Sequence, residues 1–330
     1  MKASFINQTG SPDVIQYGEL PNPKPGKGEC LIKVGAVAVN PIDTYVRSGA
    51  IPAKLKFPLI LGRDVAGTVV ETGLGVKHFK VGDRVWASNQ GTDGRAGTFA
   101  EYAAVHERWL NITPANATDE EMAALALVSI TAHLGLVHHV GLRAHETLFV
   151  NGGSGGVGSC VVQIAKILGA RVIATVGNDS KAHICRELGA DLVINYNFGD
   201  TTEAIRAAAP KGVDVWWETV RDPDFERTIS LLAMRGRMVV MAGRDARPVF
   251  PVGPFYVKDC SIHGFAMFNA TAREQKTAGN AISRWVSEGK LKARIDRVLT
   301  LSETAAAHQL QQDSTVNRTG VLTGKIVLKP

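Results

Sequence analysis

Closely spaced cysteines are missing from this chain of 330 residues. Its four cysteines stand far apart in the sequence, at Cys30, Cys160, Cys185 and Cys260. Because structural zinc lobes use pairs such as C-x-x-C, this spacing excludes a lobe of that kind. Scattered thiols are also typical of reduced cysteines, so we expect a cytoplasmic protein.

A long apolar run is missing as well. No stretch reaches the length of a membrane span, and Met1 to Asn7 lack the apolar core of a signal peptide. The formal net charge is +6, but the lysines and arginines are not gathered in runs. Nucleic-acid binding favours concentrated basic residues. The expected partner is therefore a small molecule rather than a membrane or a nucleic acid.

The residues that are present divide the chain into two parts, and its length favours two domains. Before residue 120, alternating apolar segments such as 30–39 and 65–71 are separated by Gly and Pro turns. This pattern indicates a compact β-rich, partly open barrel. From residue 146, strand and helix patterns alternate. A late helix over 272–288 and strands at 295–301 and 325–328 suggest that the tail rejoins the first part.

The second part opens on a glycine-rich stretch. An apolar strand over 146–150 precedes it, an amphipathic helix over 159–168 follows, and a second strand covers 171–176. Within this frame Gly153, Gly155 and Gly158 satisfy G-x-G-x-x-G, the pattern of a dinucleotide-binding turn. We expect Gly153 to permit the sharp turn, Gly155 the approach of a pyrophosphate, and Gly158 close packing of the helix. The residues expected to bind the pyrophosphate are Gly153, Ser154, Gly155, Gly156, Val157 and Gly158.

Six strands with crossover helices are expected in this part, which is the number in a doubly wound Rossmann domain. The sequence therefore predicts an α/β protein with a doubly wound parallel sheet and a second, β-rich domain. The six strands are predicted at residues 146–150, 171–176, 191–195, 213–217, 237–242 and 261–265.

The tip of the second predicted strand favours NADPH over NADH. NAD-binding domains place a carboxylate there to bind both ribose hydroxyls, whereas this strand ends at Gly177. A glycine leaves room for a 2′-phosphate, and Ser180 and Lys181 offer a hydroxyl and a positive charge. The carboxylate of Asp179, shortly after the strand, instead favours NADH.

Two devices that activate a carbonyl for hydride transfer are missing. No Cys/His cluster has metal-site spacing, and the adjacent His138 and His139 would point in different directions on a helix. None of the five tyrosines has a lysine four positions later, the usual metal-free acid pair. With neither device, the acceptor should take hydride easily, as quinones and activated enones do.

Several motifs together resemble one family. The segments at 39–49 (V-N-P-I-D-T-Y-V-R-S-G), 62–67, 80–85, 97–102 and 320–328 are similar in order and spacing to zinc-free quinone oxidoreductases of the medium-chain dehydrogenase/reductase superfamily. The zeta-crystallin branch is the best match. The resemblance implies a GroES-like catalytic domain over 1–123 and 271–330, an inserted Rossmann domain over 124–270, and a cleft between them. It also implies NADPH and a homodimer.

The resemblance also implies catalytic residues. Zinc-dependent relatives carry a cysteine where this chain has Asn40 and a histidine where it has Arg63. Asn40 and Tyr45 should face the nicotinamide and the substrate. Tyr45 either donates a hydrogen bond or proton to the quinone or only shapes the pocket. Arg63 either polarises a carbonyl or pairs with a carboxylate such as Asp64.

Further cofactor contacts are implied in the same way. Tyr196 should pack at the adenine end, and Val220 to Asp222 depart from the small and amide residues common after the fourth strand. The complete set of additional contacts is Thr131, Gly177, Ser180, Lys181, Tyr196, Ala242, Gly243, Arg244, Phe265, Met267, Phe268 and Asn317.

These observations together predict an NADPH-dependent quinone reductase that transfers hydride directly and without zinc. An enone or enoyl-thioester reductase on the same fold is the alternative among enzymes. A non-catalytic protein that senses NADPH or binds RNA is the alternative outside enzymes, although clustered basic and aromatic residues are missing.

Overall fold

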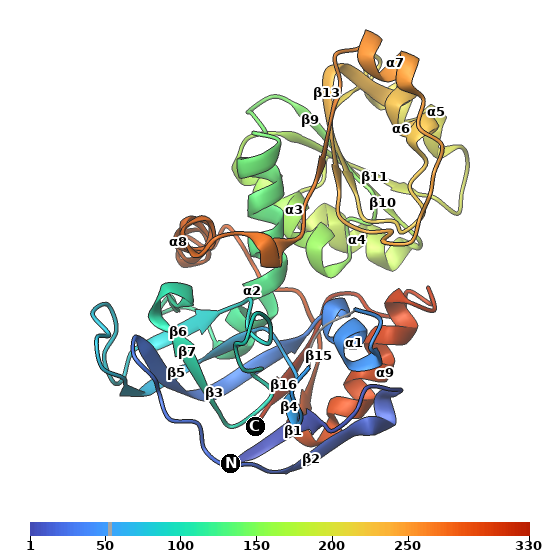
Figure 1. Ribbon diagram of the computed structural model, residues 1–330. Coiled ribbons are helices and arrows are strands. Elements are labelled where there is room, and N and C mark those ends of the chain that lie inside the picture. Colours follow the sequence, from blue (N-terminus) through green and yellow to red (C-terminus); the bar gives the residue numbers. More distant parts are fainter. Residues whose placement is uncertain (52–54) are drawn as a thin grey trace. The chain divides into compact units, whose positions relative to one another are not determined.

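The computed structural model describes residues 1–51 and 55–330. The chain forms two compact units, which Figure 1 shows as the blue, cyan and red parts and the green to orange part. Unit 1 comprises residues 1–130 and 270–330, and unit 2 comprises residues 131–269. The first division falls inside helix α2 (Asp119–His133) and the second just before α8 (Ala272–Ser287). The domain boundaries derived from the sequence, at 123/124 and 270/271, stay a prediction.

Unit 2 is built on a parallel sheet of six strands in the order β11-β10-β9-β12-β13-β14. The order reverses between β9 and β12, which is the switch point of a doubly wound fold. The Rossmann prediction is therefore confirmed. The strands are β9 (Thr147–Val150), β10 (Arg171–Val176), β11 (Leu192–Asn195), β12 (Val213–Glu218), β13 (Leu232–Val240) and β14 (Ser261–Gly264).

Helices α4, α5 and α6 of unit 2 begin where short polar side chains cap them. Asn178, Asp200 and Asp224 each accept hydrogen bonds from backbone N–H groups of the first turn. The helix expected from residue 159 begins earlier, at Gly156. The helices are α3 (Gly156–Ile167), α4 (Asp179–Glu187), α5 (Thr201–Ala208), α6 (Phe225–Leu231), α7 (Val252–Val257), the π-helix η3 (Leu134–His139) and the 3-10 helix η4 (Met267–Asn269).

Unit 1 is β-rich. A seven-stranded sheet has the order β15-β16-β3-β5-β6-β8, with β7 also on β3, and a three-stranded sheet has the order β2-β1-β4. The strands are β1 (Lys2–Ile6), β2 (Ile15–Glu19), β3 (Glu29–Val39), β4 (Leu59–Ile60), β5 (Val65–Thr72), β6 (Arg84–Ala87), β7 (Tyr102–His106), β8 (Asn111–Ile112), β15 (Ile295–Thr300) and β16 (Lys325–Lys329).

The C-terminal tail completes unit 1. Strand β16 pairs antiparallel with β3, so that Ile326 lies opposite Val39. The tail therefore rejoins the N-terminal part, as the sequence suggested. The remaining helices are α1 (Pro41–Ser48), α8, α9 (Thr304–Thr315) and the 3-10 helices η1 (Pro12–Val14), η2 (Glu107–Trp109) and η5 (Leu301–Glu303).

Among the described residues, one helical stretch is long and apolar enough to cross a membrane. It runs from Asp119 to His139, through α2 and η3, and 78% of its most apolar window is buried inside the protein. Core helices of globular proteins pass the same length and composition test, so the stretch is weak evidence for a membrane span.

A neutral histidine lies in the core of unit 1. The His308 ring is fully buried, 6.1 Å from the Phe99 ring, and neither of its nitrogens has a hydrogen-bond partner in the described chain. Burial, reinforced by the charge of Arg47, lowers the pKa of His308 to about 3. His308 therefore stays neutral in the folded state at pH values below its ordinary pKa of 6.5, at which it is protonated in the unfolded chain.

This burial predicts acid sensitivity. Because the pKa of His308 is lower in the folded state, its contribution to stability is fully present above pH 6.5. This contribution is lost progressively as the pH falls towards 3. At pH 5 the loss should be about 2 kcal/mol. We expect His308→Leu to reduce the fall in unfolding free energy between pH 7.5 and pH 5, measured with urea. The exposed His183→Gln is the control and should keep the wild-type slope. An unchanged slope in His308→Leu would contradict the assignment.

Candidate functional site

The glycine-rich turn lies at the carboxyl end of β9, between the ends of β10 and β12. Gly152 makes the sharp turn with a φ of 82°, in the left-handed region that favours glycine. Gly153 does not, and a Cβ at Gly153 would lie 2.8 Å from the Ala174 Cβ. The expectation that Gly153 makes the turn is therefore wrong. A residue without a side chain is needed at position 153 because the turn packs directly on β10.

Gly155 and Gly158 have different surroundings. Among the described residues, a Cβ on Gly155 would touch only the Gly152 carbonyl oxygen, at an ordinary 3.6 Å, so this face of the loop is open. A Cβ on Gly158 would lie 2.1 Å from the same oxygen, which is impossible without displacing backbone. Gly158 thus permits the start of α3 to lie against the turn, as predicted. The N–H groups at the start of a helix suit an anionic group.

The polar residues after β10 are held by one another. Asn178 caps α4: its Oδ1 accepts hydrogen bonds from the Lys181 backbone N–H (2.9 Å) and from the Ser180 hydroxyl (2.8 Å). The Asp179 carboxylate accepts a hydrogen bond from Asn195 Nδ2 at 3.2 Å. This bond ties the carboxylate of Asp179 to the end of β11.

Gly177 lies beside the Tyr196 ring. A Cβ on Gly177 would lie 2.4 Å from the Tyr196 hydroxyl oxygen. The missing side chain therefore makes room for the tyrosine, a reason that was not apparent from the sequence. The Tyr196 side chain is half exposed. The structure thus brings Gly177, Ser180, Lys181 and Tyr196 together at one edge of the sheet.

The segments after β13 and β14 lie at the same edge. Gly243 has a φ of 80°, and a Cβ there would lie 2.2 Å from the Arg221 carbonyl oxygen, so the segments after β12 and β13 touch. Phe265 follows β14 and stacks on His139, with ring centroids 4.5 Å apart. Of the remaining predicted contacts in unit 2, Thr131 and Met267 are buried, Ala242 is half-buried, and Arg244 and Phe268 are exposed.

Unit 1 holds a buried chain of polar groups around Asn40. Asn40 has no exposed surface, and its Nδ2 donates to Asp64 Oδ2 at 2.7 Å and to the Ala38 carbonyl at 3.3 Å. The Lys325 ammonium donates to Asn40 Oδ1 and to the Val39 carbonyl. Asn40 thus links an ammonium to a carboxylate. A side chain engaged in this way is suited to positioning α1, which begins at the next residue.

Asp64 accepts a further hydrogen bond from the Ser88 hydroxyl at 2.6 Å. Burial raises the pKa of Asp64, while Lys325 and the hydrogen bonds from Ser88 and Asn40 act in the opposite direction. Because the Asp64 carboxylate accepts hydrogen bonds from Asn40 and Ser88 and interacts with the Lys325 ammonium, the geometry favours the carboxylate form.

Arg63 pairs with Asp43. Its Nε lies 3.7 Å from Asp43 Oδ1, and its Nη1 donates to the Gln90 carbonyl at 3.3 Å. Pairing with a carboxylate was one of the two expectations for Arg63, but the carboxylate is Asp43 rather than Asp64. Burial raises the pKa of Asp43 to about 7, against the effect of Arg63 and of the hydrogen bond from the Asn40 backbone N–H.

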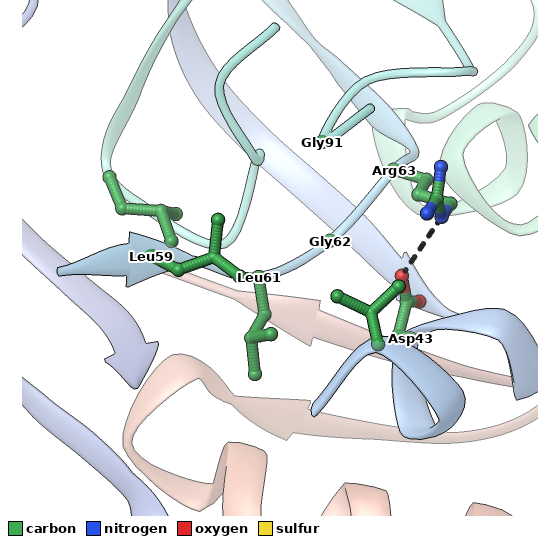
Figure 2. Close-up of a pocket in the computed structure, with 8 residues that line it drawn as sticks. Asp43, Leu59, Leu61, Gly62, Arg63 and Gly91 are labelled. Carbon is green, nitrogen blue, oxygen red and sulfur yellow. Dashed lines mark ion pairs between the residues drawn. The ribbon is translucent and has the colours of Figure 1, made fainter. Parts of the chain in front are cut away.

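A small hollow borders this pair. Figure 2 shows Arg63 and Asp43 pointing towards one another on one side of it, with Leu59 and Leu61 on the other. The volume is ≈ 10 Å³, about the space of one water molecule. Ligand pockets are usually roughly 300–1,000 Å³. The hollow is therefore not a substrate pocket.

The other predicted residues of unit 1 lie on α1 and after α9. Tyr45 is half-buried on α1, five positions after Asn40. Asn317 is exposed after α9, and its Nδ2 donates to Asp313 at 2.8 Å. The roles of these residues in catalysis and cofactor binding stay predictions.

Lys325 and Asp43 belong to the site but were not predicted from the sequence. The signal for Lys325 was weak: one lysine at the start of the apolar strand Lys325–Lys329, where any partner is distant in sequence. Asp43 lies three positions after Asn40, which is the spacing of an N-terminal helix cap. Asn151 and Glu218, at the ends of two strands, were also missed.

Within residues 1–51 and 55–330, no three His, Cys, Asp or Glu residues come together as a metal site. Asn40 and Arg63, which by the resemblance stand where zinc-dependent relatives carry ligands, are engaged with Asp64 and Asp43. An amide and a guanidinium do not supply the thiolate and imidazole ligands of zinc. The residues present thus do not fit zinc at this place.

Comparisons with known proteins place the chain in a family. A family described as "Alcohol dehydrogenase GroES-like domain" matches residues 26–115, and one described as "Zinc-binding dehydrogenase" matches residues 156–284. Human quinone oxidoreductase is 31% identical over 330 residues, covering 99% of this chain and 97% of the relative. Acryloyl-coenzyme A reductase of Sulfurisphaera tokodaii is 29% identical, with both chains covered completely.

A solved structure agrees with these matches. The crystal structure of Escherichia coli quinone oxidoreductase complexed with NADPH is 28% identical, and each chain is covered completely with a TM-score of 0.87. The fold, the glycine-rich turn and the similarity over the full length lead to one conclusion. The chain belongs to the zeta-crystallin-like quinone oxidoreductases of the medium-chain dehydrogenase/reductase superfamily and is an NAD(P)H-dependent oxidoreductase.

Proposed function

We propose that the protein is an NADPH-dependent quinone reductase that works without zinc. One observation carries the choice of acceptor. By the resemblance, Asn40 and Arg63 stand where zinc-dependent relatives hold the metal. The Asn40 side chain donates a hydrogen bond to the buried Asp64, and Arg63 forms an ion pair with the buried Asp43. A site without a metal to polarise a simple carbonyl suits an acceptor that takes hydride easily, and a quinone is such an acceptor.

NADPH supplies the hydride when it is bound. The N–H groups after Gly155 would bind its pyrophosphate, since this face of the turn is open and begins α3. Ser180 and Lys181 would hold the 2′-phosphate, and the bond from Asn195 directs Asp179 towards β11. Hydride transfer converts the quinone into the quinol anion, which needs one proton to become the quinol. Tyr45 on α1 is the proposed proton donor.

The test is a screen of acceptors with purified protein. NADPH oxidation should be faster with ortho- or para-quinones than with simple aldehydes, and a chelator should leave the rate unchanged. The same screen should include simple enones and acyl thioesters. A rate that a chelator abolishes would refute the zinc-free assignment.

A second candidate is an enoyl-thioester reductase on the same fold. The full-length similarity to an acryloyl-coenzyme A reductase supports it. A rate with acryloyl-coenzyme A well above that with every quinone would favour this candidate over the first.

Tyr45 separates two versions of the proposal. If its hydroxyl donates the proton, Tyr45→Phe should lower turnover by about 10²-fold, the lower range for a lost general acid. If the ring is only a wall of the pocket, turnover should stay at the wild-type value. Turnover with one quinone at saturating NADPH distinguishes the two.

Lys181 should select the cofactor. We expect Lys181→Ala to raise KM for NADPH about tenfold, because a lost charge-assisted bond costs roughly 1.5–3 kcal/mol. The KM for NADH should hardly change, since NADH has no 2′-phosphate. Lys211→Ala, at an exposed lysine before the start of β12, is the matched control. Equal effects on both cofactors would contradict the assignment.

We also propose a homodimer. Strand β14 is an edge of the parallel sheet, with Ile262 exposed on it, and Tyr256 and Val257 of the preceding α7 are more than 60% exposed. An edge strand with an exposed apolar side chain is suited to pairing with a second copy. Sedimentation equilibrium should give the mass of a dimer, and Ile262→Asp should shift it towards the monomer. A monomeric wild-type protein would contradict the proposal.

The cytoplasmic location stays a prediction.

A further inference from the structure

A polar cluster lies beside the glycine-rich turn of unit 2, and the half-buried Asn151 is at its centre. The Asn151 backbone N–H donates to the Trp217 carbonyl at 3.0 Å, and the Asn151 carbonyl accepts from the Thr219 hydroxyl. Its Oδ1 accepts from the Thr175 hydroxyl at 2.7 Å. One residue thus connects the carboxyl ends of β9, β10 and β12.

Glu218 is the charged member of the cluster and is 2% exposed. Asn151 Nδ2 donates to Glu218 Oε1 at 3.0 Å and contacts Oε2 at 3.3 Å. Trp216 Nε1 donates to Oε2 at 3.0 Å, and the Val220 backbone N–H donates to Oε1 at 2.7 Å. Both oxygens therefore meet donors, and Arg227 of α6 is the cation that favours the carboxylate.

The cluster ends on the turn itself. The same Thr175 hydroxyl that donates to Asn151 accepts a hydrogen bond from the Gly152 N–H at 3.1 Å. The Thr175 carbonyl accepts from the Gly153 N–H at 3.0 Å. The bonds form an unbroken path from Glu218 through Asn151 and Thr175 to Gly152, the residue with positive φ.

We infer that Asn151 and Glu218 are positioning residues that fix the glycine-rich turn in the conformation that binds the cofactor pyrophosphate. This inference rests on the proposed NADPH binding at the turn. Neither side chain is placed against the cofactor, so both act through Thr175 and the backbone of the turn. The alternative is that the cluster only satisfies buried polar groups and stabilises unit 2 as a whole.

A negative charge introduced into the pair separates these alternatives. In Asn151→Asp, two carboxylates face one another at about 3 Å, and like charges in a buried pair repel. We expect the NADPH dissociation constant, measured by fluorescence titration, to rise about tenfold or more. The kcat at saturating NADPH should stay within about twofold of wild type, since the chemistry itself is untouched.

The second variant is a rescue. In Asn151→Asp/Glu218→Gln, the introduced amide donates to the introduced carboxylate, so the repulsion is removed. The dissociation constant should return only part of the way to the wild-type value, because either Trp216 or Val220 loses its acceptor. Thr175→Val removes only the hydroxyl between Asn151 and Gly152. It replaces Asn151→Asp as the test variant if Asn151→Asp does not fold. It should also weaken NADPH binding. Glu146→Gln is the matched control, because Glu146 pairs with Arg237 at 2.6 Å at the opposite end of β9.

Hydrogen exchange of the apoprotein gives a readout that needs no cofactor. Amides 152–155 should exchange faster in Asn151→Asp, slowly again in the double variant, and unchanged in Glu146→Gln. Wild-type dissociation constants in folded Asn151→Asp and Thr175→Val, or a double variant no better than the single one, would overturn the inference. A wild-type protein that does not bind NADPH would instead overturn the proposed function.

Discussion

The Gly158→Ala variant is expected to lose NADPH binding and to destabilise unit 2. Its Cβ would lie 2.1 Å from the Gly152 carbonyl oxygen and 3.0 Å from the Gly153 Cα. Both neighbours are backbone, so α3 must move away from the turn. Overpacking of this kind costs roughly 3 kcal/mol, and displacement of the N–H groups should weaken NADPH binding by about a hundredfold or more. Urea unfolding and fluorescence titration measure the two effects.

Two other glycines make the prediction specific. A Cβ on Gly155 meets only the Gly152 oxygen at 3.6 Å, so Gly155→Ala should keep the wild-type stability and lose affinity for NADPH. Among the described residues, a Cβ on Gly253 in α7 meets nothing within 4 Å, so Gly253→Ala should lower neither the stability nor the affinity. Wild-type stability and affinity in Gly158→Ala would show that the turn and α3 do not pack as described.

Lys325→Met is the second variant with a large expected effect. It removes the ammonium that donates to Asn40 and leaves the buried Asp64 without its cation. Breaking a buried charge pair on one side costs roughly 3–5 kcal/mol. The unfolding free energy should fall by about that amount, and turnover with a quinone should fall as well, because Asn40 begins the helix that carries Tyr45.

A second substitution at Asp64 should rescue Lys325→Met, and Lys329 on strand β16 offers a control. Lys325→Met/Asp64→Asn removes both charges, and most of the lost stability should return because no buried charge is left uncompensated. Lys329 lies on the same strand, half exposed, and pairs with Glu120. Exposed pairs contribute about 0–1 kcal/mol, so Lys329→Met should change stability little. A wild-type unfolding free energy in Lys325→Met would contradict the role given to the ammonium.

Much of unit 2 could be predicted from the sequence because its signals are local. Each strand is a short apolar run between turn residues, and each helix follows within a few positions. The strand over 171–176 was predicted with its observed bounds, Arg171–Val176. The strand expected at 237–242 instead begins at Leu232, directly after α6, where no glycine or proline separates helix from strand.

Helices α1 and α9 were not predicted from the sequence. Helix α1 is only eight residues long, so its apolar residues make little more than two turns of pattern. In α9, Ala, Gln and Thr outnumber large apolar residues, and the buried positions include His308 and Gln311. Such helices are stable because they pack on each other and on unit 1, and a sequence pattern does not carry that information.

The glycine-rich turn and the six strands that present it were determined by the sequence alone, because adjacent residues encode turns, periodicity and caps. The preference for NADPH at Gly177 to Lys181 was read from the same local signals. The partners of Asn40 were decided only by the tertiary structure. Asp64 is 24 positions away and Lys325 is 285, and β16 meets β3 only when the tail returns to unit 1. Burial then obliges these charges to pair, whereas each of them alone in the sequence could equally lie in water.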